Sequence, residues 1–99
     1  MLVHSVFFWM KPESTAAQRE ELRRGLESLR AIKSADTVFI GAPAPLAERG
    51  NRDSSYAFAL TVLFKDVAAH EAYQIDPLHV GFIAAHRTLW SRVQVYDAL

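Results

Sequence analysis

The chain has 99 residues, of which 51% are hydrophobic and 22% charged, and its 11 basic side chains balance 11 acidic ones. This length predicts a single domain over residues 1–99. The balanced charge argues against nucleic acid or an anionic membrane as a partner. Cysteine is absent, which excludes disulfides, thiolate catalysis and cysteine-ligated metals and fits a reducing cytoplasm.

The first predicted element is a strand over residues 2–11, which is rich in β-branched and aromatic side chains. Its alternate positions form two faces that are both mainly apolar, with His4 on one and Ser5 on the other. A solvated strand would be polar on one side, so both faces should be covered. The segment is too short to span a bilayer and lacks the basic flank of a signal peptide, so we expect a cytoplasmic protein without membrane contact.

A helix is predicted after the break at Pro12. Thr15 and Gln18 have the spacing of a capping box, in which each side chain bonds the backbone N–H of the other residue. The face opposite the apolar stripe is charged and is expected to be solvated. The stripe itself consists of Leu22, Leu26, Leu29 and Ile32.

Two further strands are predicted over residues 37–42 and 56–64, and a polar loop over residues 44–55 joins them. In the later strand, large apolar side chains alternate with mostly small ones, which indicates one face in the core. Asp66 can cap a second helix over residues 67–74. Pro77 ends that helix at Asp76, because the proline ring disfavours helical geometry in the residue before it.

The last part of the chain shows apolar residues at helical spacing from Phe82 to Trp90, followed by a predicted strand over residues 93–98. The order of elements is β-α-β-β-α-β, which predicts an α+β fold of the ferredoxin-like type with an antiparallel sheet. Helices on one face of this sheet cannot cover both faces of the first strand. We therefore expect a symmetric homodimer in which two sheets pack face to face.

The break at Asp76 and Pro77 separates the two side chains best suited to chemistry. Tyr73 lies at the end of one helix and His79 starts a new turn, so a phenol and an imidazole can converge on a cavity between helices and sheet. The chain contains no glycine-rich phosphate loop and no G-x-S-x-G motif.

Three local features accompany this order of elements: the opening segment Val3–Lys11, the segment Asp76–Val80 with its Pro-x-His-Val motif, and an aromatic final strand. Together they resemble the stress-responsive A/B barrel (Dabb) family over essentially the whole chain. The resemblance implies a dimeric α+β barrel. Many members of this family have no assigned reaction. One plant member is a cyclase that closes a linear tetraketide by an aldol reaction without metal or organic cofactor.

The resemblance to that cyclase implies roles for individual residues. Tyr73 and His79 match residues implicated in its catalysis, a phenol that bonds a carbonyl oxygen and a base that takes a proton beside it. His4 matches a pocket histidine on the first strand. The cyclase has a second pocket histidine on its third strand, where this chain has Phe58. Loss of that polar group changes how a substrate is oriented, which argues against tetraketide cyclisation itself. The apolar residues expected to line the pocket are Phe58, Leu60, Phe82 and Leu89.

Simpler roles compete with these. His79 can bond a backbone carbonyl at a helix start, Tyr73 can be an ordinary buried tyrosine, and His4 can be a satisfied core histidine. We expect no metal site, because His70, His79 and His86 show no close His-x3-His or His/carboxylate spacing. The resemblance to the cyclase implies that no organic cofactor is needed either. Three classes of function stay open: a small cofactor-independent enzyme (a cyclase, lyase or isomerase) acting on an apolar carbonyl compound, a non-catalytic module that binds a small apolar or aromatic ligand, and a dimeric stress-associated protein that works by association.

Overall fold

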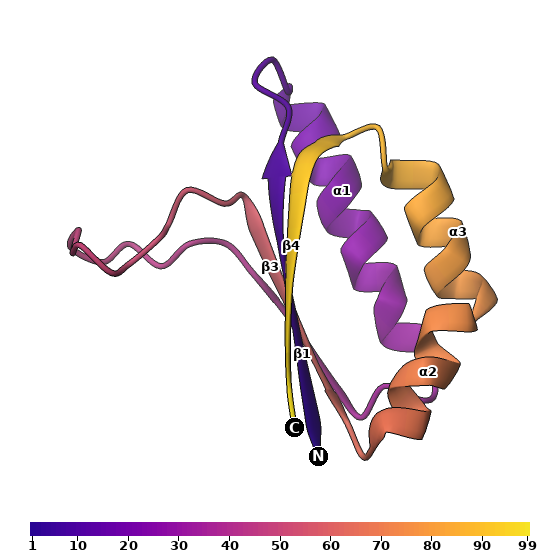
Figure 1. Cartoon of the computed structure of the whole chain (residues 1–99). Coiled ribbons are helices and arrows are strands. Elements are labelled where there is room, and N and C mark those ends of the chain that lie inside the picture. The colour runs from indigo at the N-terminus through magenta and orange to yellow at the C-terminus, as the bar shows by residue number, and fades with distance from the viewer.

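The sheet has the antiparallel α+β arrangement that the order of elements predicts. The computed structural model describes all 99 residues and has one four-stranded sheet in the order β2-β3-β1-β4, with the helices gathered on one of its faces (Figure 1). The ferredoxin-like prediction is therefore confirmed. The elements are β1 (Leu2–Met10), α1 (Ala16–Ser28), the 3₁₀ helix η1 (Leu29–Ala31), β2 (Thr37–Gly41), β3 (Phe58–Phe64), α2 (Val67–Ile75), α3 (Pro77–His86) and β4 (Trp90–Ala98).

β1 is an inner strand that pairs with β3 on one side and with β4 on the other. Its even-numbered residues from Leu2 to Phe8 face the helices and are at most 7% exposed, whereas the odd-numbered ones face away and are only partly buried. β3 repeats this alternation, as the sequence predicts. Its buried residues are Phe58, Leu60, Val62 and Phe64.

The start of α1 is the predicted capping box. Gln18 N donates to Thr15 Oγ1 at 3.1 Å, and Thr15 N donates to Gln18 Oε1 at 2.9 Å. The apolar stripe that follows begins in α1, continues through η1 and packs into the core, where none of its members is more than 2% exposed. These members are Leu22, Leu26, Leu29 and Ile32.

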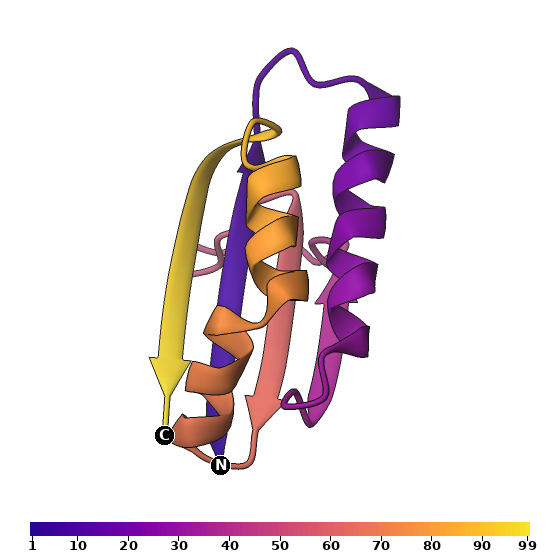
Figure 2. The same cartoon turned by 90° about the vertical axis from the view of Figure 1, so that its right-hand side faces the viewer.

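α2 and α3 follow one another over the part of the sheet that contains β1, and β4 forms the edge of the sheet on that side (Figure 2). Asp66 caps α2 by accepting from Ala69 N at 2.9 Å. α1 and α3 approach each other at Gly25, where a Cβ atom would come within 2.6 Å of His86 Nε2, so this close packing requires glycine. None of the helices has the length and apolarity needed to cross a membrane.

The boundary between α3 and β4 differs from the prediction. α3 ends at His86 and β4 begins at Trp90 instead of Val93, so Leu89 and Trp90 lie outside the helical run in which their spacing placed them. The cause is nonlocal, because the pairing of β4 with β1 extends to Met10, which lies opposite Trp90. Hydrogen bonds to a neighbouring strand outweigh a helical pattern that Leu89 and Trp90 would only extend at its end.

The connection between β2 and β3, residues 42–57, contains no helix or strand and projects away from the helical side of the sheet (Figure 1). It includes the loop predicted over residues 44–55 and continues to residue 57, because β3 begins at Phe58 and not at Tyr56. Trp9 Nε1 donates to Ser55 Oγ at 2.9 Å. This bond ties the end of the loop to the face of the sheet that carries no helices.

Candidate functional site

The junction between α2 and α3 is fixed by Asp76 and Pro77. Asp76 is extended, with φ −62° and ψ 134°, and it ends α2 and begins α3. Its N–H donates to Tyr73 O at 3.2 Å, and its carboxylate accepts from Leu78 N at 2.9 Å. The change of helix direction brings the rings of Tyr73 and His79 to a centroid separation of 4.7 Å. The two side chains that the sequence singles out therefore lie together.

Tyr73 projects from α2 into the core and is fully buried. Its ring packs edge-on against Phe64, with the centroids 5.1 Å apart, but its hydroxyl has no hydrogen-bond partner within the protein. Burial raises the pKa of Tyr73 to about 12, so the phenol stays protonated at neutral pH. A buried hydroxyl that keeps its proton and lacks a partner is free to donate to a ligand.

His79 lies in the first turn of α3 and is half-buried. Its Nδ1 is 3.2 Å from the carbonyl oxygen of Gln74, so in the neutral ring Nδ1 carries the proton and Nε2 keeps a free lone pair. Burial lowers the pKa of His79 below the usual 6.5 and outweighs the opposite effect of the bond to Gln74. At neutral pH the imidazole is therefore an uncharged base.

His4 lies on the helix-facing side of β1 and is only 4% exposed. The register of β1 and β4 places Asp97 opposite it, and His4 Nδ1 is 2.5 Å from Asp97 Oδ1. The His4 ring is also 4.8 Å from the ring of His70 and 6.0 Å from that of Tyr73. His4 is thus a bonded core histidine and a neighbour of Tyr73 at once. The sequence analysis did not single out Asp97, and antiparallel pairing of the two terminal strands is the signal that could have found it.

These side chains meet at a cavity of about 180 Å³ between the sheet and the helices. His4, Tyr73 and His79 line it together with Leu60 and Phe82, which the sequence analysis placed in the pocket wall. No Asp, Glu, Lys or Arg belongs to the wall, so the cavity offers no ionic partner to a charged ligand. The wall residues that the sequence analysis missed are Val6, Phe8, Leu29, Gln74, Ile83, Trp90, Val93 and Val95.

Phe58 and Leu89 were also expected in the pocket wall, but both are buried elsewhere in the core and do not line the cavity. The guanidinium group of Arg19 lies 5.5 Å from the centre of the Phe58 ring, so Phe58 packs near the start of α1. Leu89 borders a separate hollow that includes Lys11 and Gln18. Side-chain alternation predicts that Phe58 faces the helices. It does not predict how far along the sheet Phe58 lies from the cavity.

His86 has structural partners of its own. Its ring stacks on Phe82 with the centroids 5.0 Å apart, and its Nδ1 is 2.9 Å from the carbonyl oxygen of Phe82. The close approach of α1 at Gly25 confines the other edge of the ring. His86 does not line the cavity, although its spacing from His79 is compatible with a shared helix face.

Comparison with known proteins gives a match over almost the whole chain. The model of the Stress Responsive A/B Barrel Domain matches residues 2–99. Among curated proteins, olivetolic acid cyclase from Cannabis sativa is 28% identical over 95 residues, which cover 95% of this chain and 91% of that protein.

Solved structures with similar folds include one enzyme as well as proteins of unknown function. Hydroxynitrile lyase from Passiflora edulis has a TM-score of 0.81 at 17% identity and covers 98% of this chain and 90% of its own. A dimeric ferredoxin-like protein of unknown function from Thermobifida fusca has a TM-score of 0.79 at 24% identity, with coverages of 98% and 88%. A Dabb family protein from Mesorhizobium loti has a TM-score of 0.78 at 20% identity, with coverages of 99% and 94%. At these identities the likeness shows the fold alone.

The unpartnered hydroxyl of Tyr73 leads to a prediction about stability. Tyr73→Phe should raise the free energy of unfolding by about 1 kcal/mol, because it removes a buried polar group that no protein atom satisfies while the ring keeps its packing. Urea denaturation followed by circular dichroism measures the change. Thr88→Val is the control, since it removes an exposed hydroxyl in the turn between α3 and β4 and should have almost no effect. A loss of stability in Tyr73→Phe would mean that the hydroxyl has a partner after all.

Proposed function

The chain belongs to the stress-responsive A/B barrel domain family, and from this premise we propose that it is a small enzyme that acts on a neutral, apolar carbonyl compound. His79 serves as the base and Tyr73 as the hydrogen-bond donor, and no organic cofactor takes part. The observation that carries the proposal is the unpartnered hydroxyl of Tyr73 at the wall of an apolar cavity, beside an uncharged His79. Two of the similar proteins are themselves enzymes, a cyclase and a lyase.

The proposed chemistry is proton transfer beside a carbonyl group. His79 Nε2 takes a proton from the carbon next to the carbonyl. The electron pair of the broken C–H bond forms a C=C bond to the carbonyl carbon, and the π pair of the C=O bond moves onto the oxygen to give an enolate. Tyr73 donates a hydrogen bond to that oxygen as its negative charge develops, which stabilises the transition state. His79 then returns the proton to carbon or to a leaving group. The hydrogen bond between His79 and Gln74 O holds the ring in the tautomer that this step needs.

The composition of the cavity wall supports a neutral, apolar substrate. It contains no formally charged residue apart from histidine, so a carboxylate or phosphate buried there would have no ion pair to offset its loss of hydration. Leu60, Phe82 and Val95 contribute apolar surface, and the volume of about 180 Å³ limits the occupant to a small molecule. A neutral aldehyde or ketone with an apolar body fits both conditions. His4, held by Asp97, adds one polar contact at the same wall.

A non-catalytic binding module is the second candidate. The predominantly apolar wall would hold a small apolar or aromatic ligand whether or not a reaction follows. In that case Tyr73 would orient the ligand by a single hydrogen bond, and His79 would stay unchanged during binding. The two candidates differ in one measurable respect, since only the enzyme moves protons to and from the bound compound.

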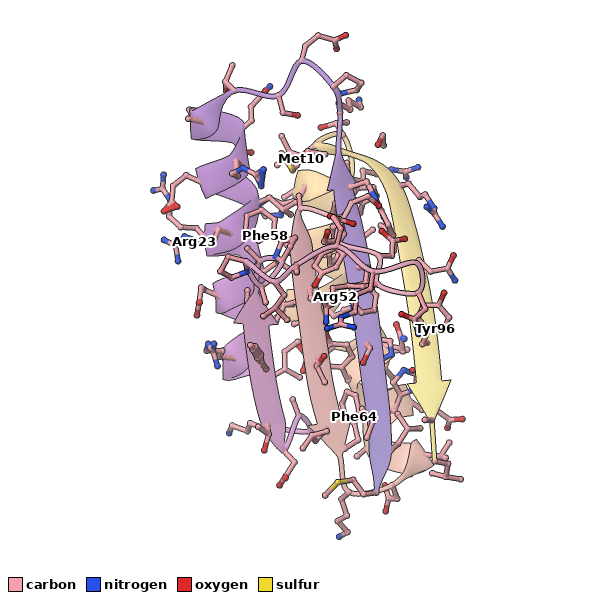
Figure 3. All side chains as sticks on the ribbon, turned by 90° about the vertical axis from the view of Figure 1, so that its left-hand side faces the viewer. Met10, Arg23, Arg52, Phe58, Phe64 and Tyr96 are labelled. Atoms are coloured by element: carbon pink, nitrogen blue, oxygen red, sulfur yellow. The ribbon has the colours of Figure 1, made fainter.

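The open face of the sheet supports a homodimer. Side chains on this face come from β1, β2, β3 and β4, and no helix lies over them (Figures 1 and 3). Phe39 and Tyr96 are 54% and 63% exposed, and Phe7 packs edge-on against Tyr56 and Tyr96. Aromatic surface of this extent is typical of an interface. The similar protein from Thermobifida fusca is a dimer, and we infer that two copies of this chain pack through the same face.

We further propose that the dimer works in the cytoplasm and that nucleic acid and membranes are not its partners. The chain has no cysteine that an oxidising compartment could pair, and its 11 basic and 11 acidic side chains leave no net charge to attract a polyanion.

Exchange of carbon-bound protons with solvent tests the proposed reaction. Incubated in D₂O with a panel of small neutral ketones and aldehydes, the protein should introduce deuterium next to the carbonyl of those compounds that fit the cavity, which NMR detects directly. His79→Ala should lower the exchange rate by roughly 10²–10⁴-fold, the usual contribution of a general base, and Tyr73→Phe by roughly 10²–10³-fold, as for loss of an oxyanion donor. His86→Ala is the matched control and should exchange at the wild-type rate.

The same assay decides between the two candidates. A compound that binds saturably but never exchanges, at any rate above the uncatalysed one, would favour the binding module. Exchange that persists unchanged in His79→Ala would remove His79 from the mechanism even if the protein proves to be an enzyme.

The state of His79 also sets the pH dependence. The base works only when it is uncharged, so kcat/KM should fall as the pH falls through the His79 pKa and should be constant above it. Because burial lowers this pKa, the midpoint should lie below the usual 6.5 of histidine. Tyr73, with a pKa of about 12, should cause no second decline in the neutral range. A midpoint above 6.5 would contradict the assigned environment of His79.

A charge introduced on the open face should prevent dimer formation without unfolding the chain. Phe7→Glu places a carboxylate among the aromatic side chains of that face and should convert the dimer into a monomer, because pairing two sheets would bury the charge. Light scattering at micromolar concentration measures the mass, and circular dichroism checks the fold. Ala84→Glu, at an exposed position of α3, is the control and should stay dimeric. A monomeric wild-type protein would contradict the assembly directly.

A further inference from the structure

We propose that His4, His70 and Asp97 form a binding site for a divalent transition-metal ion at the end of the sheet where both chain termini lie (Figure 2). Each of the three offers one ligand atom, a ring nitrogen or a carboxylate oxygen, and the three atoms all lie within 4.8 Å of one another. Neither the acid–base reaction nor the dimer proposed above requires this site, and the inference does not rest on them.

The distances are close to those of a metal centre. Zinc binds nitrogen and oxygen ligands at about 2.0–2.2 Å, which places the ligand atoms of a tetrahedral site roughly 3.3 Å apart. In the protein, His4 Nδ1 and Asp97 Oδ1 are 2.5 Å apart and the largest separation in the group is below 4.8 Å. A shift of about an ångström at Asp97 and at His70 would therefore bring them to bonding positions around one ion beside His4.

Asp97 and His70, whose side chains must shift to bind an ion, are less buried than His4. His4 is buried on an inner strand and supplies the fixed ligand. Asp97 lies near the end of the edge strand β4, and its side chain is 42% exposed, so its carboxylate can rotate. His70 lies on α2 and is half-buried. Gln74, one turn further along α2, has its side-chain amide 3.0 Å from His70 Nε2. When His70 binds the ion through Nδ1, that amide can turn over so that its Oε1 accepts from the Nε2–H and steadies the ring, as outer-shell groups do in metal sites.

The chemistry of the ligands selects the kind of metal. Two imidazoles and one carboxylate suit zinc, cobalt, nickel or copper, whereas magnesium and calcium prefer sites made only of oxygen. Three protein ligands leave a fourth position for water. When the ion binds through His4 Nδ1, it replaces the proton that His4 now shares with Asp97, and that proton is released to solvent.

The close spacing of these residues is invisible in the sequence. His4 on β1 and His70 on α2 are 66 positions apart, and His70 and Asp97 on β4 are 27 positions apart. A search for metal motifs examines short spacings, and the histidines that such a search pairs, His79 and His86, are not the ones the fold brings together. The site therefore runs against the expectation from sequence spacing that the chain has no metal ligands.

Isothermal titration of the metal-free, full-length protein with ZnCl₂ tests the proposal, and titration with CoCl₂ reports the ligand geometry through visible absorption. We expect saturable binding of one ion per chain and the intense visible bands of four-coordinate cobalt. His70→Ala and Asp97→Asn should each weaken binding by at least roughly tenfold, since even changes in outer-shell groups cost that much. Both positions lie outside the buried core, so these variants should fold.

His86→Ala is the matched control, because it removes one of the four histidines without touching the cluster. It should bind zinc as tightly as the wild-type protein. Absence of saturable binding in the wild-type protein would overturn the proposal, and so would wild-type affinity in both His70→Ala and Asp97→Asn. Equal weakening by His86→Ala would show that the ion binds histidines on the surface at large, which also contradicts the assigned site.

Discussion

The position of β1 inside the sheet is the constraint on which the rest of the structure depends. Its backbone is bonded to neighbours along both edges, and side chains of both faces are largely apolar. The helices cover only one face. On that face, burial of Val6 and Phe8 contributes roughly 1.5–3 kcal/mol each and sets the depth at which His4 lies. The registers with β3 and β4 then determine its neighbours, so the single buried polar residue of the strand acquires Asp97 as its partner. The other face is left with aromatic side chains and no cover.

The junction at Asp76 and Pro77 determines how Tyr73 and His79 are placed relative to each other. A proline at the first position of α3 fits the start of a helix but forces the residue before it out of helical geometry. The cap at Asp76 contributes about 0.5–2 kcal/mol, similar to the penalty of about 1–3 kcal/mol for leaving the Tyr73 hydroxyl without a partner. Packing of the Tyr73 ring against Phe64 and His79 offsets the part of this penalty that the cap does not. The site is thus kept at a modest local cost in stability, which is common where a ligand supplies the missing bond.

Features encoded by a few neighbouring residues could be predicted from the sequence, and features that arise from pairing could not. The capping box at Thr15, the end of α2 at Asp76 and the alternation in β3 depend on local chemistry, and each is present as expected. The meeting of Tyr73 with His79 follows from the same local break. The start of β4 at Trp90 and the place of Phe58 along its strand depend on register, which no short pattern specifies. The cluster of His4, His70 and Asp97 is the extreme case, because its members share no segment of the chain.

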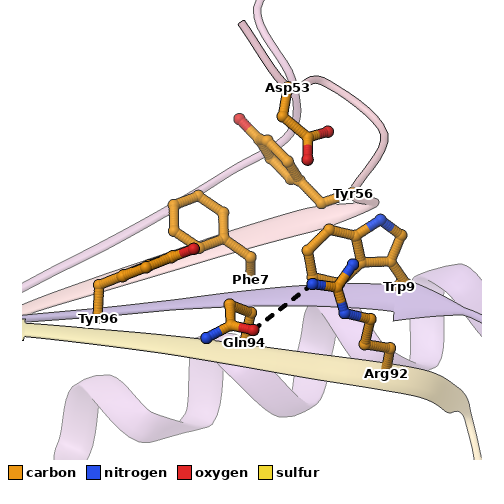
Figure 4. Close-up of a pocket in the computed structure, with 7 residues that line it drawn as sticks. All are labelled: Phe7, Trp9, Asp53, Tyr56, Arg92, Gln94 and Tyr96. Carbon is orange, nitrogen blue, oxygen red and sulfur yellow. Dashed lines mark hydrogen bonds between the residues drawn. The ribbon is translucent and has the colours of Figure 1, made fainter. Parts of the chain in front are cut away.

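The two faces of the sheet differ in what they expose. The hollow on the open face (Figure 4) is lined by Phe7, Trp9, Tyr56 and Tyr96 together with Asp53, Arg92 and Gln94. Arg92 lies over Trp9, 4.2 Å from the ring centre, and Asp53 accepts hydrogen bonds from Ser55, which hold its pKa below the usual range. The polar groups of this hollow are thus paired or solvated. Tryptophan, tyrosine and arginine, which line it, are the residues that concentrate binding energy in protein interfaces. On the helical face, by contrast, the cavity holds a donor without a partner and a base without a charge. Because neighbouring residues of β1 point to opposite faces, substitution of Phe7 acts on the open face and substitution of His4 acts on the cavity, although both lie on the same strand.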